Sequence, residues 1–160
     1  MRQLIKQRDI VSDPWCYVDE DPLGRARALI LPFARWKEER ERWWLWDGRL
    51  GVRIGPSDPV LALEHDLLRI ALVAIEFGGI GEGRGYSQAQ ILRKRCRFTG
   101  ELRAVGQIQR DQLFYLARCG FDAFELPEGA DLAAALTAFD SFSVAYQPAV
   151  DQGLALQQRT

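Results

Sequence analysis

Short apolar runs alternate with amphipathic stretches along most of this chain. Five short runs are rich in apolar residues, with at most two charged residues in each, and glycine, proline or aspartate bounds them as it bounds buried strands. These runs cover residues 28–31, 50–54, 70–77, 102–105 and 121–126. Continuous apolar runs of this length are typical of parallel strands, because helices cover both faces of a parallel sheet.

Between these runs, apolar residues recur every three or four positions, which is the period of a helix with one buried face. The predicted helices cover residues 33–46, 58–68, 87–97, 110–119 and 131–139, and a last extended piece is expected at 142–146. An aromatic stripe runs along the first helix through Trp36 and Trp43. Such a stripe is more often core than interface, but its exposed part could serve an oligomer or a partner through helix 33–46.

The alternation of strand and helix predicts an α/β fold with a mostly parallel sheet and right-handed crossovers. An open sheet and a partial βα barrel both fit. A complete barrel needs more than about 200 residues, and the chain has 160. Residues 4–6 and 10–12 flank a polar turn and predict an N-terminal β-hairpin. We therefore expect a hairpin-like appendage at 1–24, an α/β domain at 25–148 and a mobile tail at 149–160.

Composition narrows the classes of function. The net charge of -1 argues against non-specific nucleic-acid binding. No run reaches the roughly 18 apolar residues of a membrane span, and no signal peptide is evident. With three separated cysteines and one histidine, the chain alone cannot build a four-ligand zinc site. An odd number of free thiols suits a reducing cytoplasm, so we expect a cytoplasmic protein without a metal.

The richest candidate for chemistry is the glycine-rich stretch 78–85, which precedes a helix. In parallel α/β folds ligands bind at the carboxyl ends of the strands, where this stretch falls. Arg84 offers a forked cation, and Ser87 could cap the helix or donate to a phosphate. The glycine spacing matches neither a dinucleotide fingerprint nor a P-loop. Contact with an anion or cofactor and a capped structural loop both remain open.

Arg103 lies within a predicted strand, where a charge must pair or face a cavity. Glu76 and Glu125 end the neighbouring strands and are its expected partners, in a charged pocket floor or a structural ion pair. We expect Arg84, Tyr86, Ser87, Arg103 and Glu125 to line one rim. With Gly85, these form the candidate anion- or cofactor-binding set. No catalytic residue can be assigned, and no intrinsic cofactor is the default expectation.

Four consecutive blocks carry a more specific signal. They are residues 83–89, 100–106, 110–113 and 118–126. In this order and spacing they resemble a bacterial domain-of-unknown-function family, number nine-three-four, whose members are often labelled oxidoreductases. The resemblance extends over nearly the whole chain. Many relatives carry aspartate where this chain has Gln107, so no role is assigned to that position.

The resemblance implies a place in sulfur assimilation. Genes of the family typically lie beside those for phosphosulfate reductase and for the haem subunit of assimilatory sulfite reductase, in organisms that often lack the usual flavoprotein subunit. It therefore implies an accessory protein for cysteine biosynthesis that assists electron delivery to the haem subunit, its expected partner. Two alternatives stay open: an oxidoreductase that binds a flavin or nicotinamide at the glycine-rich rim, and a small-anion-binding module.

Overall fold

The computed structural model describes residues 2–79 and 83–145. An eight-stranded sheet forms its centre, in the order β2-β1-β8-β7-β6-β5-β4-β3. Strands β3 to β8 run parallel, β1 is antiparallel to β8, and β2 is antiparallel to β1. The strands are β1 (Gln3–Lys6), β2 (Asp9–Ser12), β3 (Cys16–Tyr17), β4 (Ala28–Pro32), β5 (Arg49–Ile54), β6 (Ile70–Phe77), β7 (Glu101–Gly106) and β8 (Ala123–Phe124).

The connections between strands are mostly helical. The α-helices are α1 (Phe33–Glu38), α2 (Arg40–Leu45), α3 (Arg84–Gln90), α4 (Leu113–Arg118) and α5 (Leu132–Ala145). Short 3₁₀ turns form η1 (Val18–Glu20), η2 (Val60–Asp66) and η4 (Arg110–Gln112), and a π-helical turn, η3 (Ile91–Arg95), continues α3. Within the described residues, no helix has both the length and the apolar character needed to cross a membrane.

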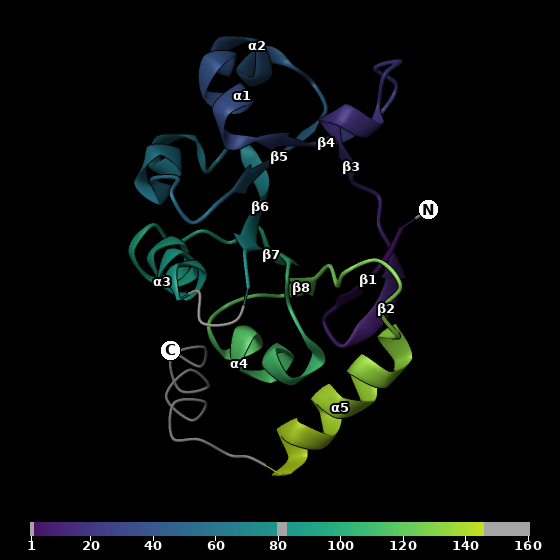
Figure 1. The fold of residues 1–160 in the computed structure, drawn as a ribbon. Helices are drawn as coiled ribbons and strands as arrows, with labels where there is room; N and C mark the ends of the chain where they lie inside the picture. Colours follow the sequence, from purple (N-terminus) through teal and green to yellow (C-terminus); the bar gives the residue numbers. More distant parts are fainter. Residues whose placement is uncertain (1, 80–82, 146–160) are drawn as a thin grey trace.

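The sheet is curled into a half-barrel, and the chain connectivity requires this curl. Strands β2 and β3 form opposite edges of the sheet, yet only residues 13–15 join them. Four residue steps span at most about 14 Å, whereas eight flat strands would be about 34 Å across. Figure 1 shows the strands as an arc, with the helices outside it and the link from β2 to β3 across its open side.

Alternate residues of the strands serve two different layers. One set packs under the helices on the convex face, where Val52, Ile75 and Leu102 belong with Trp36 and other helix residues to the larger core cluster. The other set faces the concave side, where Ile30, Leu72 and Ala74 pack with Trp15 from the link between the edges. Both faces are therefore filled, as the continuous apolar runs predict.

The predicted α/β class and mostly parallel sheet are confirmed, in the form of a partial barrel. The hairpin is also confirmed: Gln7 and Arg8 adopt left-handed φ angles of 52° and 66°, as a two-residue hairpin turn requires. Because β1 pairs with β8, the hairpin extends the central sheet. The predicted tail at 149–160 lies outside the described residues.

Some expected elements differ from the observed ones. Strand β3 was not expected, since only two residues pair there. The first helix is two helices, α1 and α2, joined at Glu39. The extended piece expected from residue 142 is wrong up to 145, because α5 continues through it. Alanine favours helix, and no glycine or proline interrupts the chain between Ala130 and Pro148.

Candidate functional site

The carboxyl ends of the parallel strands surround a charged mouth. Two cavities open there, of about 620 Å³ and 710 Å³. Glu20 and Arg53 line both of them, so the cavities are neighbours. Ligands of parallel α/β folds bind at this end of the sheet, which makes the mouth the first place to look for a site.

Arg103 of β7 lies as a buried floor beneath the lining of the two cavities, 3.4 Å from Glu125, and is 1% exposed. Its guanidinium donates to both carboxylate oxygens of Asp13, at 2.8 and 3.0 Å, and to Glu101 at 2.9 Å. Burial opposes ionisation of Asp13, but the hydrogen bonds and charge of Arg103 outweigh it and lower the pKa of that carboxyl group. Asp13 is therefore ionised at neutral pH.

Glu125 joins this floor to the surface. One of its oxygens lies 3.4 Å from Arg103 Nη1 and 3.4 Å from Arg2 Nη1. The other accepts a hydrogen bond of 3.0 Å from the Tyr17 hydroxyl. Burial, reinforced by the charge of Glu125, raises the pKa of Tyr17 well above its usual value. The Tyr17 hydroxyl is thus a fixed proton donor here and cannot serve as a base near neutral pH.

Arginine side chains also pack on the Tyr17 ring. The guanidinium of Arg2 lies 4.8 Å from the ring centroid, and that of Arg53 lies 5.4 Å from it. Arg2 Nη2 contacts both oxygens of Glu20, at 2.7 and 2.9 Å. Arg53 pairs with Glu76 at 3.2 Å. Every arginine of the mouth therefore has a carboxylate partner.

Carboxylates outnumber cations in the mouth. Among the described residues that line its two cavities, six are acidic and two are basic: Asp19, Glu20, Asp58, Glu76, Glu125 and Glu128 against Arg2 and Arg53. An excess of one sign in a concave site attracts ligands of the opposite sign. The mouth therefore favours cationic or neutral groups over free small anions.

The structure brings only part of the predicted site set together. Arg103 and Glu125 meet as expected, whereas Glu76 pairs with Arg53. The predicted common rim does not form, because Arg103 points into the concave layer. Arg84 begins α3 on the convex side and donates to the Pro56 carbonyl oxygen at 3.3 Å.

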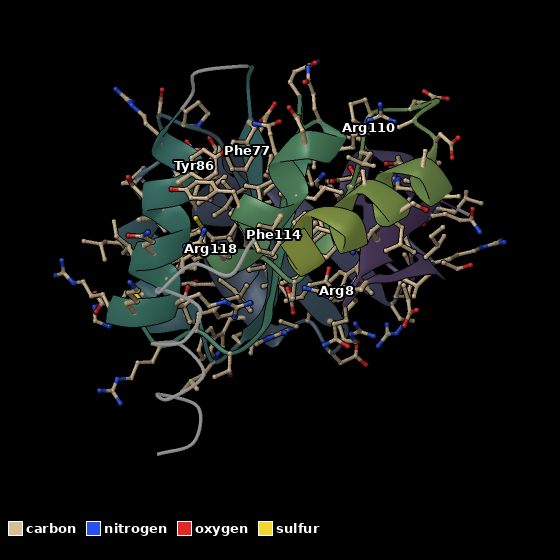
Figure 2. All side chains as sticks on the ribbon, turned by 90° about the horizontal axis from the view of Figure 1, so that it is seen from below. Arg8, Phe77, Tyr86, Arg110, Phe114 and Arg118 are labelled. Atoms are coloured by element: carbon tan, nitrogen blue, oxygen red, sulfur yellow. The ribbon has the colours of Figure 1, made fainter. Side chains whose placement is uncertain are left out.

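The other predicted residues of α3 lie on the convex side as well. A Cβ atom at Gly85 would lie 2.5 Å from the Phe77 ring, so this glycine permits close packing of helix on strand. Tyr86 packs edge-on against Phe77, with ring centroids 5.2 Å apart. Figure 2 labels the two side chains, which lie next to each other. Ser87 lies within α3, whose N-cap is Gly83 and has no side-chain cap hydrogen bond. Binding of an anion or cofactor by these residues stays a prediction.

Sequence reasoning missed four members of the mouth. Arg2, Asp13, Tyr17 and Glu20 all come from the segment expected to be an appendage. Asp13 is ninety positions from Arg103, and no spacing rule connects them. The available signal was Arg103 itself, because a fully buried guanidinium needs more carboxylate partners than the adjacent strands supply.

Burial disfavours the thiolate form of all three cysteines. Burial raises the pKa of the Cys119 thiol, which leaves it protonated and unreactive. All three cysteines are free. Within residues 2–79 and 83–145, no group of three or more His, Cys, Asp or Glu side chains could hold a metal ion.

A second feature lies at the opposite, amino end of the sheet. Trp44 and Leu45 end α2 shortly before β5, and Leu68 precedes β6; their exposed fractions are 49%, 84% and 103%. The Arg69 guanidinium holds the two segments together by donating to the carbonyl oxygens of Trp43 and Gly48, each at 3.2 Å. We call Trp44, Leu45 and Leu68 the amino-end surface. Exposed large apolar side chains that gather in this way are typical of an interaction surface.

Comparison with known proteins identifies a family over more than half of the chain. No curated protein matches the sequence. Residues 51–156 match the model of DUF934, described as a bacterial protein of unknown function. The match begins in β5, so it covers less of the chain than the predicted near-complete resemblance. It includes all four sequence blocks that carried the resemblance, and the chain therefore belongs to the DUF934 family of bacterial proteins of unknown function.

Proposed function

We propose that this protein is an accessory component of assimilatory sulfite reduction. In this proposal it docks on the haem subunit of sulfite reductase and assists electron delivery to that subunit. The amino-end surface is the observation that carries the proposal, because an accessory protein needs an apolar area that is free to bind a partner. The surface lies at the end of the sheet opposite the mouth, so docking there would leave the mouth open.

Family membership supports the metabolic setting of the proposal. The DUF934 match covers Leu68 of the amino-end surface. The resemblance that led to the family implies gene neighbours that encode the haem subunit and phosphosulfate reductase. A protein made together with the haem subunit, and carrying an exposed apolar surface, fits an accessory subunit.

The two alternative functions have weaker physical support. A site for sulfite or sulfate would have to overcome the excess of carboxylates in the mouth. A flavin or nicotinamide site at α3 would need the glycines for close cofactor approach, but the packing of Phe77 already accounts for Gly85. Docking is therefore the proposal that an observed feature, the amino-end surface, supports.

Growth of a deletion strain tests the proposed function. A strain without the gene and without a second copy should grow on sulfide but fail to grow on sulfite as sole sulfur source. The wild-type gene on a plasmid should restore growth on sulfite. Equal growth of the deletion strain on both sources would refute the proposal.

Complementation with surface variants tests the role of the amino-end surface. A double variant, Leu45→Asp with Leu68→Asp, should not restore growth on sulfite. Both side chains are exposed, so stability should change by no more than about 0.5 kcal/mol per site. The matched control is Leu23→Asp, because Leu23 is 71% exposed and lies in the loop between η1 and β4. If the control fails equally, loss of growth cannot be assigned to the surface.

A further inference from the structure

A strongly basic segment lies between Gly83 and Gly100. It holds five arginine or lysine residues and no acidic residue, within a chain whose net charge is -1. Four of these cations occur within five positions, 93–97, around the π-helical turn η3. π-Helical turns are rare and occur frequently at functional sites. Neither the mouth nor the core accounts for this concentration of charge.

Arg93 has a structural role that separates it from its neighbours. Its guanidinium donates to the carbonyl oxygens of Phe98, Gly100 and Gly120 at distances between 2.8 and 2.9 Å. It thereby fixes the turn that leads from η3 into β7. The remaining cations, Lys94, Arg95 and Arg97, are exposed. We call these three residues the basic cluster.

The basic cluster lacks local neutralisation. Across residues 2–79 and 83–145, none of its three side chains forms an ion pair with a carboxylate. Arg97 also occupies the left-handed region with φ of 55°. A non-glycine residue in that region costs of order 1 kcal/mol or more, and such positions concentrate at functional sites. The chain thus keeps a cation where glycine would be the more stable choice.

Topology places the basic cluster beside the amino-end surface. Because β5, β6 and β7 are adjacent and parallel, the segments that lead into them meet along one edge of the sheet. These segments carry Leu45, then Leu68, then Arg97. Turn η2 packs on η3, and charges from both, Glu64 and Arg95, act on the thiol of Cys96. Acidic groups also lie on this side: Glu41 and Asp66 line the hollow beside Trp44 and Leu45, where Asp66 pairs with Arg40, and Glu64 acts on Cys96.

We propose that the basic cluster and the amino-end surface form one docking interface, and that its occupant is a protein face with an apolar centre flanked by carboxylates. The identity of that occupant as the sulfite reductase haem subunit rests on the proposed function. Complementarity argues for a protein with such a face. Its carboxylates would pair with the cations of the basic cluster, and its apolar centre would pack on the exposed leucines. Of the six residues of this interface only Trp44 is aromatic, whereas single-stranded nucleic acid stacks successive bases on aromatic side chains.

Salt-dependent binding of the purified haem subunit to the purified full-length chain tests the inference. Complementary charges at the edge of an interface raise the association rate, and salt screens them. The dissociation constant should rise by about tenfold or more between about 50 and 500 mM salt, because screening of charges increases strongly over this range. Most of the change should appear in the association rate.

Charge reversal locates the effect within the chain. Arg95→Glu should weaken binding by about tenfold at low salt and flatten the salt dependence. The matched control is Arg25→Glu, which reverses another exposed arginine, in the loop before β4. The control should bind as the wild type does. Equal affinity of Arg95→Glu and wild type would overturn the inference.

A third variant separates binding from folding. Arg97→Gly relieves the left-handed backbone, so its melting temperature should stay the same or rise. It should nevertheless bind the haem subunit several-fold more weakly, on the order of 3- to 10-fold for one interface charge. Unchanged binding by a stable Arg97→Gly would exclude Arg97 from the interface and overturn its place in the cluster.

Three further outcomes separate failure of this inference, binding of nucleic acid and failure of the proposed function. Absence of binding at low salt, together with a deletion strain that cannot use sulfite, would overturn the docking interface but leave the sulfite role standing. Binding of a single-stranded RNA oligomer that Arg95→Glu abolishes would assign the cluster to nucleic acid and overturn the inference. Salt-dependent binding of the purified proteins, together with normal growth of the deletion strain on sulfite, would support the interface and refute the metabolic role.

Discussion

Arg103 and Asp13 are ninety positions apart in sequence, yet their side chains form a two-pronged ion pair inside the half-barrel. The guanidinium nitrogens lie 2.8 and 3.0 Å from the two carboxylate oxygens, and each side chain is at most 1% exposed. Asp13 follows β2, which forms one edge of the sheet, and Arg103 lies in β7. The pair therefore ties the link that crosses the open side to the centre of the sheet.

Replacing Asp13 should reduce stability strongly. Asp13→Asn keeps the shape but removes the charge that faces a buried guanidinium, leaving Arg103 with Glu101 and Glu125. Breaking a buried pair on one side costs about 3 to 5 kcal/mol, and the remaining carboxylates should hold the loss near the lower value. Urea unfolding followed by tryptophan fluorescence measures it. Glu20→Gln is the control, since its exposed pair with Arg2 should contribute less than about 1 kcal/mol.

The same pair predicts how stability depends on pH. Arg103 lowers the pKa of Asp13 in the folded state despite burial. Its contribution to stability is therefore fully present above the unfolded pKa of about 3.9 and is lost as pH falls through the lower folded pKa. The free energy of unfolding should drop below about pH 4. It should drop less steeply in Asp13→Asn, and equal slopes in the two proteins would contradict this assignment.

Local sequence patterns predicted the layers of the fold but not its closure. The apolar runs at β4, β5, β6 and β7 show their strands directly, because a buried parallel strand is apolar on both faces. The curl follows from the long-range pairing of β1 with β8, which joins Ile5 to Phe124 and leaves β2 and β3 at opposite edges of the sheet. Strand β3 has only two paired residues, too few to leave a pattern.

The candidate site was predictable only where one residue implied its partner. Buried Arg103 required a carboxylate, and Glu125 at the end of the next strand was a correct choice. The grouping of Arg84 with Arg103 ignored that helix α3 covers the convex face, whereas the Arg103 side chain points to the other. Asp13 and Tyr17 could not be found from local spacing, because tertiary folding alone brings them to the mouth.

Removing the Tyr17 hydroxyl should have a small, specific effect. Tyr17→Phe keeps the ring beneath the two guanidiniums but loses the 3.0 Å hydrogen bond to Glu125. Glu125 still faces Arg2 and Arg103, so stability should fall by only about 1 kcal/mol. Chemical unfolding at neutral pH provides the measurement. A loss as large as that of Asp13→Asn would mean that Glu125 depends on Tyr17 far more than on its arginines.

The glycine-rich segment offers a test of packing against ligand binding. Gly85→Ala would place a methyl group 2.5 Å from the Phe77 ring, so helix and strand must move apart. Overpacking of this kind costs about 1 to 3 kcal/mol. Gly83→Ala is the matched control, because a methyl group there meets no atom within 4 Å. Thermal or urea unfolding of the two variants should therefore give a clear difference.

The pair of glycine variants also separates the two interpretations of this segment. If Gly85 serves packing alone, Gly85→Ala should lower the stability of the protein. Cells in which the variant is still folded should nevertheless grow on sulfite. If the segment approaches a cofactor, Gly83→Ala should abolish growth on sulfite without loss of stability, since backbone approach to an anion tolerates no added side chain. The packing of Phe77 on Gly85 favours the first result. The second result would support the predicted cofactor contact at the N-terminal end of α3.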